Sequence, residues 1–388
     1  MTEFYIGLMS GTSLDGIDAA LVDFTDQKAQ LVYFECLPFQ ADIQSSIQKL
    51  SKPDALISLK EYGAMDTRLG HLFAESVNIL LAKAKIPAES VHAIGSHGLT
   101  IYHAPDIQLP FSLQIGDPNI IAEQTGITTV ADFRRRDIAA GGQGAPLVPA
   151  FHQAAFHDSN ESRCIVNIGG IANITVLPKN HSATVTGFDT GPGNTLMDLW
   201  IKLHKNLPYD QNGTWGRTGN IDHDLVSLLK QDGYFNTAPP KSTGKEYFSL
   251  PWVYQYFDAF NYKAENIQAS LCFLTAITIC DAIKKYAPDT ERILICGGGI
   301  HNSYLLELIR QNSECSVEST EHYGLHPDHV EAVAFAWLAR QTLCGLPGNL
   351  KEVTGALSAA ILGGIYQGNK KGGILSPNER RETIGQLR

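Results

Sequence analysis

Short apolar and polar stretches at the start of the chain predict a β-hairpin. Apolar residues fill 4–9 and 17–24, with a polar, glycine-containing turn between them. Asp15-Gly16 in this turn is a strong hairpin signal, because glycine adopts positive φ easily and aspartate tolerates it. A similar pattern of two apolar stretches around a glycine-bearing turn recurs at 164–177, with Gly169-Gly170 in the turn. Two glycine-bearing hairpins far apart in the chain predict a duplicated architecture.

Apolar residues at helical spacing predict helices elsewhere, and short apolar stretches predict buried strands. The predicted helices lie within 56–83, 195–203, 267–283 and 330–338, and the predicted strands at 91–95, 184–188 and 293–296. The 195–203 helix should begin after Asn194 as its N-cap and place Leu196, Leu199, Trp200 and Leu203 on one face. The 267–283 helix is apolar on most sides, so we expect it to be deeply buried. This alternation of strands and helices indicates an α/β protein.

Shifts in composition suggest where the domains meet. A length of 388 residues suits two or three domains, and 132–149 is rich in Arg and Gly, as in a crossing between domains. We therefore predict a first domain of 1–131 plus 354–388 and a second domain of 132–353. Residues 209–249 are rich in Gly, Asn, Asp and Pro and predict a long, ligand-facing excursion outside the core.

Composition and charge narrow the class of protein. Hydrophobic residues make up 44 % of the chain and charged residues 18 %, which excludes a disordered or fibrous protein. The net charge of -10 points away from nucleic acid, so phosphate would have to be bound by local donors. The seven cysteines are odd in number and widely spaced, so we expect reduced core residues. No export signal or long apolar run is evident, and we expect a cytoplasmic protein without a membrane partner.

The turn of the first hairpin has features of a phosphate site. Backbone N–H groups in a glycine-permitted bend, together with the hydroxyls of Thr12 and Ser13, would fit phosphate oxygens. Asp15 and Asp18 would repel phosphate unless a cation intervened, which favours a magnesium nucleotide. An ordinary Asp-Gly hairpin is an equally good explanation of the same residues.

Two further segments are candidates for ligand contact. Asp189 follows the predicted strand 184–188 and precedes a helix N-terminus that could receive an anion, although Asp before Gly-Pro-Gly also commonly starts a turn. Gly297-Gly298-Gly299 would let a flat ring such as adenine approach bare backbone. His326 and His329 fit a helix start better than a metal site. P-loop, nucleophile-elbow and HExxH patterns are absent.

Eight short motifs, in the same order, resemble those of the anhydro-N-acetylmuramic acid kinase family. They are 8–18 (LMSGTSLDGID), 95–98 (GSHG), 114–117 (QIGD), 131–134 (ADFR), 141–147 (GGQGAPL), 167–173 (NIGGIAN), 188–194 (FDTGPGN) and 297–299 (GGG). The resemblance runs nearly end to end. It implies the α/β, two-domain fold shared by sugar kinases, actin and heat-shock-protein ATPases, with duplicated mixed-sheet cores and a cleft between the domains for nucleotide and sugar.

The resemblance also implies roles for residues of this chain. Asp189 would be the catalytic base, and the ATP phosphates would lie against Gly11, Thr12, Ser13, Leu14, Asp15, Gly16, Ile17 and Asp18. Further nucleotide contacts would come from Gly169, Gly170, Asn173, Gly191, Gly193, Asn194, Gly297, Gly298, Gly299 and Asn302. The sugar would contact His97, Asp132, Arg134 and Glu331, with Arg134 on its lactyl carboxylate. Asp15 and Asp18 would hold Mg²⁺, directly or through water. Leu99 departs from the family pattern, where glutamine is expected.

The family's substrate, 1,6-anhydro-N-acetylmuramic acid, has a bridge in place of a free hydroxyl at position six. Ring hydrolysis must therefore accompany phosphoryl transfer from ATP, giving N-acetylmuramic acid 6-phosphate and ADP in the recycling of cell-wall peptidoglycan. At the ordinary pKa of an aspartate, about 3.9, Asp189 would be a weak base. Two alternatives remain: another sugar kinase of this fold that uses a free hydroxyl, and a nucleotide-gated binding protein. The expected partners are small molecules, and a homodimer is compatible with the sequence.

Overall fold

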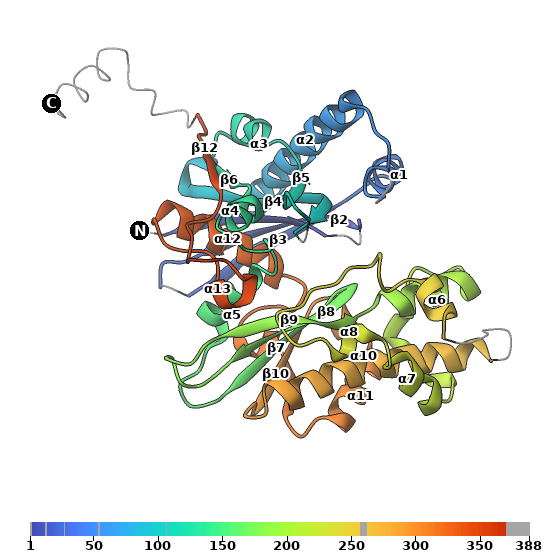
Figure 1. Ribbon diagram of the computed structural model, residues 1–388. Helices are drawn as coiled ribbons and strands as arrows, with labels where there is room; N and C mark the ends of the chain where they lie inside the picture. Colours follow the sequence, from blue (N-terminus) through green and yellow to red (C-terminus); the bar gives the residue numbers. More distant parts are fainter. Residues whose placement is uncertain are drawn as a thin grey trace, which may run out of the picture. The chain divides into compact units, whose positions relative to one another are not determined.

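The chain folds into two compact units, each built on one mixed β-sheet (Figure 1). The computed structural model describes residues 2–11, 14–26, 28–52, 55–105, 107–256 and 262–369. The first unit comprises 1–140, 331–348 and 360–388, and the second comprises 141–330 and 349–359.

The sheet of the first unit has the strand order β12-β6-β4-β1-β2-β3, with β5 paired to β4. Its strands are β1 (Phe4–Ser10), β2 (Gly16–Asp23), β3 (Gln30–Pro38), β4 (Val91–Ala104), β5 (Phe111–Ile115), β6 (Thr129–Ala131) and β12 (Gly364–Tyr366). The predicted first hairpin is confirmed: β1 and β2 pair antiparallel, with Leu8 opposite Ala19. On its other side, β1 pairs in parallel with β4.

Helices cover both faces of this sheet. They are α1 (Ala41–Leu50), α2 (Leu59–Ala84), α3 (Pro118–Thr125), α4 (Phe133–Ala139), α12 (Val330–Leu343) and a 3-10 turn, η1 (Ala88–Ser90). Apolar residues of α1 and α2 form one core with Leu8 and Ile17. On the opposite face α12 packs directly on β1 and β4: a Cβ at Gly7 would meet the backbone of Ala332, and one at Gly95 would meet the backbone of Phe335. Glycine at both positions therefore permits close helix–sheet packing.

The sheet of the second unit has the order β11-β10-β7-β8-β9. Its strands are β7 (Arg163–Ile168), β8 (Ile171–Leu177), β9 (Thr186–Pro192), β10 (Arg292–Cys296) and β11 (Ser316–Ser319). Its helices are α5 (Val148–Phe156), α6 (Thr195–Lys205), α7 (His223–Leu229), α8 (Gly233–Asn236), α9 (Leu250–Tyr254), α10 (Ala264–Tyr286), α11 (Ser303–Asn312) and α13 (Lys351–Thr354). Short 3-10 turns are η2 (Gln211–Gly213), η3 (Gly216–Thr218), η5 (Gly298–His301) and η6 (Thr320–Tyr323).

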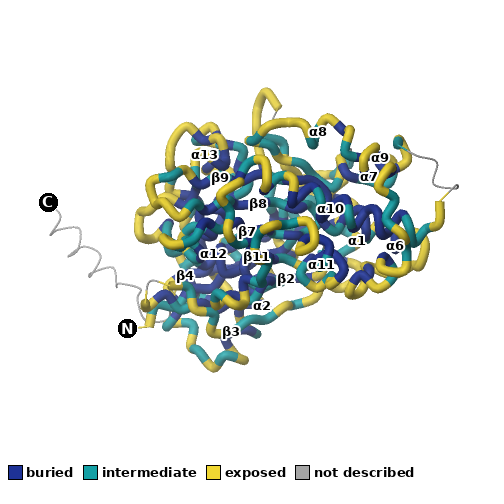
Figure 2. The backbone as a smooth tube through the Cα atoms, turned by 90° about the horizontal axis from the view of Figure 1, so that it is seen from below, coloured by how far each residue is buried: buried dark blue, intermediate teal, exposed yellow. Residues whose placement is uncertain are grey.

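The long helix α10 forms the centre of this unit's core. Figure 2 shows much of it as buried, and its apolar residues pack with Val166, Ile174 and Phe188 of the sheet. By length and hydropathy α10 could span a membrane, but 78 % of its most apolar window is buried inside the protein. This is the position of a core helix, as the sequence predicted for 267–283.

The two sheets repeat one topology. Strands β3-β2-β1-β4-β6 correspond in order and direction to β9-β8-β7-β10-β11: two antiparallel pairings are followed by two parallel ones. The duplicated mixed-sheet cores of the predicted sugar kinase, actin and heat-shock-protein ATPase-like fold are thus present in the individual units. The cleft predicted between the domains stays a prediction.

The unit boundaries differ from the predicted domains. Residues 132–140 and 331–348 belong to the first unit, and 354–359 belong to the second. The difference follows from packing, because α12 lies on β1 and β4 and the Phe133 ring is 5.6 Å from that of Phe335 on α12. The end of the tail does return to the first unit, where β12 pairs with β6.

Several local predictions are corrected. The predicted strand 91–95 continues to Ala104, because Gly95 accommodates α12 and does not turn the chain. In α6 the buried face contains Leu196, Met197, Trp200 and Ile201. Leu199 and Leu203, which were predicted to lie on that face, are exposed, and Leu203 is 55 % exposed. Segment 209–249 contributes Leu225, Val226, Leu229 and Phe248 to the core. Four of the seven free cysteines are buried, but Cys36 and Cys344 are exposed and Cys315 is half-buried.

Candidate active site

Asp189 lies within β9 and is held by three contacts from a single segment of the second unit. The sequence predicted that the strand ends before Asp189. The strand instead continues to Pro192, so Asp189 lies inside it. The Thr243 amide donates to Asp189 Oδ2 at 2.9 Å, and the Asp189 amide donates to the Lys241 carbonyl at 3.2 Å. The Tyr234 hydroxyl donates to the Asp189 carbonyl at 2.6 Å. The carboxylate therefore has a fixed position on the sheet.

Burial changes the acidity of this carboxylate. Desolvation raises the pKa of Asp189 to about 7, although the Thr243 hydrogen bond and the charge of Lys241 act in the opposite direction. The ordinary pKa expected from sequence is thus corrected, because the sequence did not show that neighbouring residues shield the half-buried carboxylate from water. A base with a pKa near the working pH is well suited to proton transfer.

The segment that holds Asp189 is itself fixed by a buried carboxylate, Asp232. Its oxygens accept hydrogen bonds from the Tyr234 amide (2.8 Å), the Tyr247 hydroxyl (2.7 Å), the Trp252 indole N–H (2.8 Å) and the Tyr256 hydroxyl (2.9 Å). Burial alone would raise the pKa of Asp232, but these hydrogen bonds lower it. No sequence pattern had singled out Tyr234 or Thr243, because their contacts join residues 45 to 54 positions apart.

The second glycine hairpin lies in the same unit as Asp189. Residue Asn173 is paired with Asp189 across β8 and β9. The amides of Gly193, Asn194 and Thr195 all donate to the carbonyls of Gly169 or Gly170, so they are not available as phosphate donors in this arrangement. The Asn194 side chain does not cap α6, and its Nδ2 donates to the Ile168 carbonyl at 3.3 Å. Gly191 is buried, and a Cβ there would lie 2.8 Å from the Phe235 ring.

In the segment predicted to contact adenine, 297–299, one of the three glycines is exposed. Gly298 is exposed, and a Cβ added to it would have no described atom within 4 Å, whereas Gly299 is buried against Ile168. Gly297 has a φ of 79° and lies against the Asn167 side chain. Asn302 has a local role, because its Oδ1 accepts from the Leu305 amide and caps α11. These contacts leave Gly298 as the position where a ring could approach the backbone.

The turn of the first hairpin is only partly described, since Thr12 and Ser13 lie outside the described residues. The Leu14 amide donates to the Gly11 carbonyl at 3.2 Å, and Leu14 has a φ of 61°. A Cβ at Gly16 would meet the backbone of Leu37, which explains glycine there. Ile17 is buried in the core. Asp15 is exposed and Asp18 is half-buried.

The carboxylates of Asp15 and Asp18 can be compared with the ligands that nucleotide-bound Mg²⁺ usually has. Asp18 is opposite Cys36, and burial together with the charge and hydrogen bond of Asp18 raises the pKa of that thiol to about 12. Among the described residues, no group of three or more His, Cys, Asp or Glu side chains is arranged to hold a metal. Nucleotide-bound Mg²⁺ commonly has one or two carboxylates and completes its shell with water and phosphate. Two carboxylates at the hairpin fit that requirement.

Two of the predicted sugar residues of the first unit are in direct contact: the buried His97 and the half-buried Arg134. The Arg134 Nε–H donates to His97 Nε2 at 2.9 Å, and the other ring nitrogen of His97, Nδ1, is 2.9 Å from the Gly98 carbonyl. Burial and the charge of Arg134 hold the pKa of His97 well below 6.5. Burial lowers the pKa of Arg134, and the charges of Glu331 and Asp137 oppose that effect. Both ring nitrogens of His97 are thus engaged, so His97 positions Arg134.

Asp132 and Leu99 are placed differently from this group. Asp132 has a φ of 64° and accepts from the Tyr366 hydroxyl at 3.1 Å, with Arg135 at 3.4 Å. Leu99 is buried in the core of the first unit. The side chain that stands where glutamine was expected therefore makes hydrophobic contacts and leaves no polar group there.

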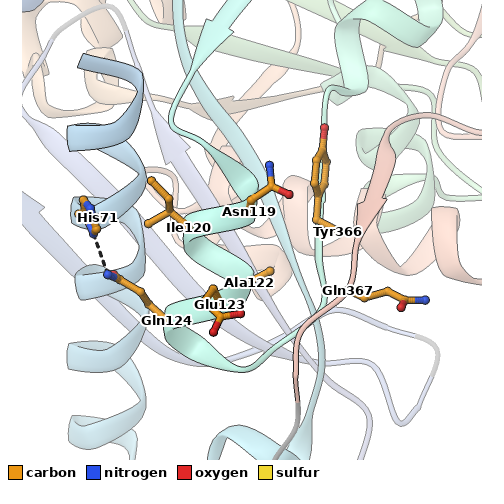
Figure 3. Close-up of a pocket in the computed structure, with 8 residues that line it drawn as sticks. All are labelled: His71, Asn119, Ile120, Ala122, Glu123, Gln124, Tyr366 and Gln367. Atoms are coloured by element: carbon orange, nitrogen blue, oxygen red, sulfur yellow. Dashed lines mark hydrogen bonds between the residues drawn. The ribbon is translucent and has the colours of Figure 1, made fainter. Parts of the chain in front are cut away.

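A surface pocket of the first unit lies elsewhere (Figure 3). It is lined by His71, Asn119, Ile120, Ala122, Glu123, Gln124, Tyr366 and Gln367. A hydrogen bond of 2.7 Å joins Gln124 to His71 across its wall. None of the residues predicted to bind nucleotide or sugar lines this pocket, so we do not assign it to the reaction.

The repeated mixed sheets and the two glycine hairpins are features of the ATP-using, duplicated-sheet class of protein that the sequence motifs implied. The model of the anhydro-N-acetylmuramic acid kinase family matches residues 3–368. The chain belongs to this family.

Individual relatives agree with that assignment. The anhydro-N-acetylmuramic acid kinase of Coxiella burnetii (strain Dugway 5J108-111) is 48 % identical over 369 residues, covering 95 % of this chain and 98 % of that protein. The corresponding proteins of Xylella fastidiosa and Photobacterium profundum are each 46 % identical, covering 93 % and 94 % of this chain and 96 % and 98 % of theirs.

Proposed function

We propose that this chain hydrolyses the internal bridge of 1,6-anhydro-N-acetylmuramic acid and transfers the terminal phosphoryl group of ATP to the oxygen released at position six. The products are N-acetylmuramic acid 6-phosphate and ADP, and the reaction belongs to peptidoglycan recycling. Membership of the family supports the substrate. The single structural observation that carries the mechanism is the half-buried carboxylate of Asp189, held by the Thr243 amide and with a pKa raised to about 7.

In the proposed reaction, Asp189 accepts a proton from a water molecule. The water oxygen forms a bond to the anomeric carbon while the bond from that carbon to the bridging oxygen breaks. The bridging oxygen then attacks the terminal phosphorus of ATP, and the bond from that phosphorus to ADP breaks. The Thr243 amide and the Tyr234 hydroxyl hold Asp189 for this step. At pH 7 a large fraction of Asp189 is ionised and still basic enough to take the proton.

Residues of the first unit bind the sugar in this proposal. Arg134 donates to His97 and interacts electrostatically with Glu331. It would pair with the lactyl carboxylate, because a guanidinium binds a carboxylate through two parallel hydrogen bonds. Asp132 would also contact the sugar. His97 acts through Arg134, since its ring nitrogens lie against the Arg134 guanidinium and the Gly98 carbonyl.

The nucleotide phosphates would lie at the first hairpin, with Asp15 and Asp18 holding Mg²⁺ directly or through water. When bound, magnesium offsets phosphate charge during transfer. Asp15→Ala is therefore expected to raise the KM for MgATP about tenfold, equal to about 1.4 kcal/mol, while the KM for the sugar stays unchanged. Steady-state kinetics at varied Mg²⁺ measure this effect. An unaltered dependence on both ATP and Mg²⁺ would remove Asp15 from the site.

Asp189→Asn tests the base directly. Both ligands should still bind, because the amide is similar in size to the carboxylate, but kcat should fall about a hundredfold to ten-thousandfold. Calorimetry measures the binding and mass spectrometry measures the product. Full turnover by the variant would exclude Asp189 as the base.

Labelled water separates the proposal from a kinase that uses a free hydroxyl. Only ring hydrolysis places the labelled oxygen on the anomeric carbon, together with a mass gain of phosphate plus water. Phosphorylation without label would assign the enzyme to an ordinary sugar kinase reaction. Location in the cytoplasm and assembly as a homodimer stay predictions from sequence.

A further inference from the structure

The second glycine hairpin carries a lysine that lies outside the eight family motifs. A Cβ at Gly170 would coincide with the Lys245 side chain and lie 3.2 Å from Lys245 Nζ. The ammonium group therefore lies on the Gly169-Gly170 turn, and only glycine at 170 leaves room for it. A lysine side chain packed on a glycine turn is a well-defined cation at a backbone position predicted to face the nucleotide.

The backbone of this turn is otherwise occupied. The amides of Gly193, Asn194 and Thr195 donate to the carbonyls of Gly169 and Gly170. These three amides are therefore not available to bind nucleotide phosphate, although such sites usually depend on backbone donors. Lys245 supplies the positive charge that these engaged amides cannot.

A second observation points to a ligand at the same place. The Thr195 hydroxyl lies 2.8 Å from the position of a Cβ at Gly170, and the side chain is 6 % exposed. Its Oγ1 has no hydrogen-bond partner among the described residues. A buried hydroxyl without a partner is unfavourable in a folded protein, and a phosphate oxygen bound beside Lys245 would satisfy it.

The same short segment reaches both this turn and the base. From 241 to 245 the chain reads Lys-Ser-Thr-Gly-Lys. The Lys241 carbonyl accepts from the Asp189 amide, and the Thr243 amide donates to the Asp189 carboxylate. The side chain of Lys245 lies on Gly170. We propose that Lys245 binds phosphate oxygens of the nucleotide at the Gly169-Gly170 turn, so that one segment positions both the phosphate and the base. This inference rests on the proposed function, which it deepens by adding a phosphate-binding residue.

Nucleotide affinity tests the proposal without sugar chemistry. Titration calorimetry of the full chain with Mg²⁺ would compare AMPPNP, which carries three phosphate groups, with adenosine, which carries none. Lys245→Met should weaken AMPPNP binding about tenfold or more and leave adenosine binding unchanged. Lys284→Met, at an exposed lysine of α10, is the matched control and should change neither. Equal AMPPNP affinity in the two variants, or an equal loss of adenosine affinity in Lys245→Met, would overturn the proposal.

Two further variants separate the charge from its surroundings. Lys245→Arg keeps the cation and should recover part of the AMPPNP affinity; no recovery would contradict a charge-based role. Gly170→Ala leaves Lys245 in the chain but fills the place of its side chain, so it should weaken AMPPNP binding as Lys245→Met does. Unchanged affinity in Gly170→Ala would also contradict the proposal. Thermal unfolding of each variant identifies any general loss of folding.

Turnover of the unaltered chain distinguishes this inference from the proposed function. If the chain binds AMPPNP through Lys245 but does not phosphorylate the anhydro sugar, the proposed reaction is wrong and the phosphate site stands. If the anhydro sugar is phosphorylated and Lys245→Met binds AMPPNP normally, the reaction stands and Lys245 is not part of it.

Discussion

At Asp189, burial and hydrogen bonding act on the acidity in opposite directions. Enclosure on β9 raises the pKa, and the Thr243 amide partly reverses this by stabilising the charged carboxylate. Because the base must be ionised to accept a proton, kcat should rise with pH and level off above about 7. The same effect makes folding less favourable as pH rises from about 4 toward 7, since the folded state keeps the proton longer than the unfolded chain does.

Replacement of Thr243 tests the contribution of its amide. Thr243→Pro removes the N–H that Asp189 accepts, so the pKa of Asp189 should rise further and the pH at half-maximal kcat should move above 7. Thr243→Ala keeps the N–H and should leave the pH profile unchanged. A pH–rate profile of the two variants measures the shift. Identical profiles for the proline and alanine variants would show that the amide does not tune the base.

At the scale of elements, close packing of α12 on β1 and β4 requires glycine at two positions, Gly7 and Gly95. A Cβ at Gly95 would meet the Phe335 carbonyl and lie 3.0 Å from the Ala339 Cβ. Backbone atoms of a packed helix cannot move aside as a flexible side chain can. The contact also explains why α12 belongs to the first unit, although it follows most of the second unit in sequence.

Gly95→Ala is therefore expected to lower the free energy of unfolding by about 3 kcal/mol. Gly63→Ala in α2 is the control, because no described atom lies within 4 Å of its added carbon and alanine favours a helix by about 0.5–1 kcal/mol. Denaturant unfolding of both variants gives the comparison. A Gly95→Ala variant as stable as the parent chain would contradict the tight packing.

Local signals in the sequence were sufficient for the hairpins but not for the site. Asp15-Gly16 and Gly169-Gly170 mark tight turns through backbone preferences, and both hairpins form. By contrast, the 209–249 segment looked like an excursion because it is rich in turn residues, whereas Phe248 is fully buried and Thr243 binds Asp189. These contacts depend on residues distant in sequence, which periodicity and composition do not register.

At the scale of the whole molecule, the two similar sheets carry different parts of the proposed chemistry. The first unit holds Arg134 and the hairpin that we propose binds phosphate, and the second holds Asp189 and Lys245. In the proposed reaction, groups from both units act on the same pair of ligands. A binding step that brings both units onto the substrates would also exclude bulk water and limit futile hydrolysis of ATP.

We therefore expect the radius of gyration to decrease when AMPPNP and the anhydro sugar bind together. Small-angle scattering of the chain alone, with each ligand and with both would measure the change. The Asp189→Asn variant provides a stable complex for the same measurement with ATP. Identical scattering in all states would mean that catalysis occurs without closure.

The burial of α10 has a consequence for how fragments of this protein behave. During synthesis, α10 leaves the ribosome before β10, which pairs with the central strand β7, and before α11, which packs against the helix. A nascent chain ending at Tyr286 therefore exposes an apolar helix that, in the finished protein, these later elements help to cover. Truncations made in this interval would be prone to aggregate or to engage chaperones, so a usable expression boundary must lie after the complete second sheet.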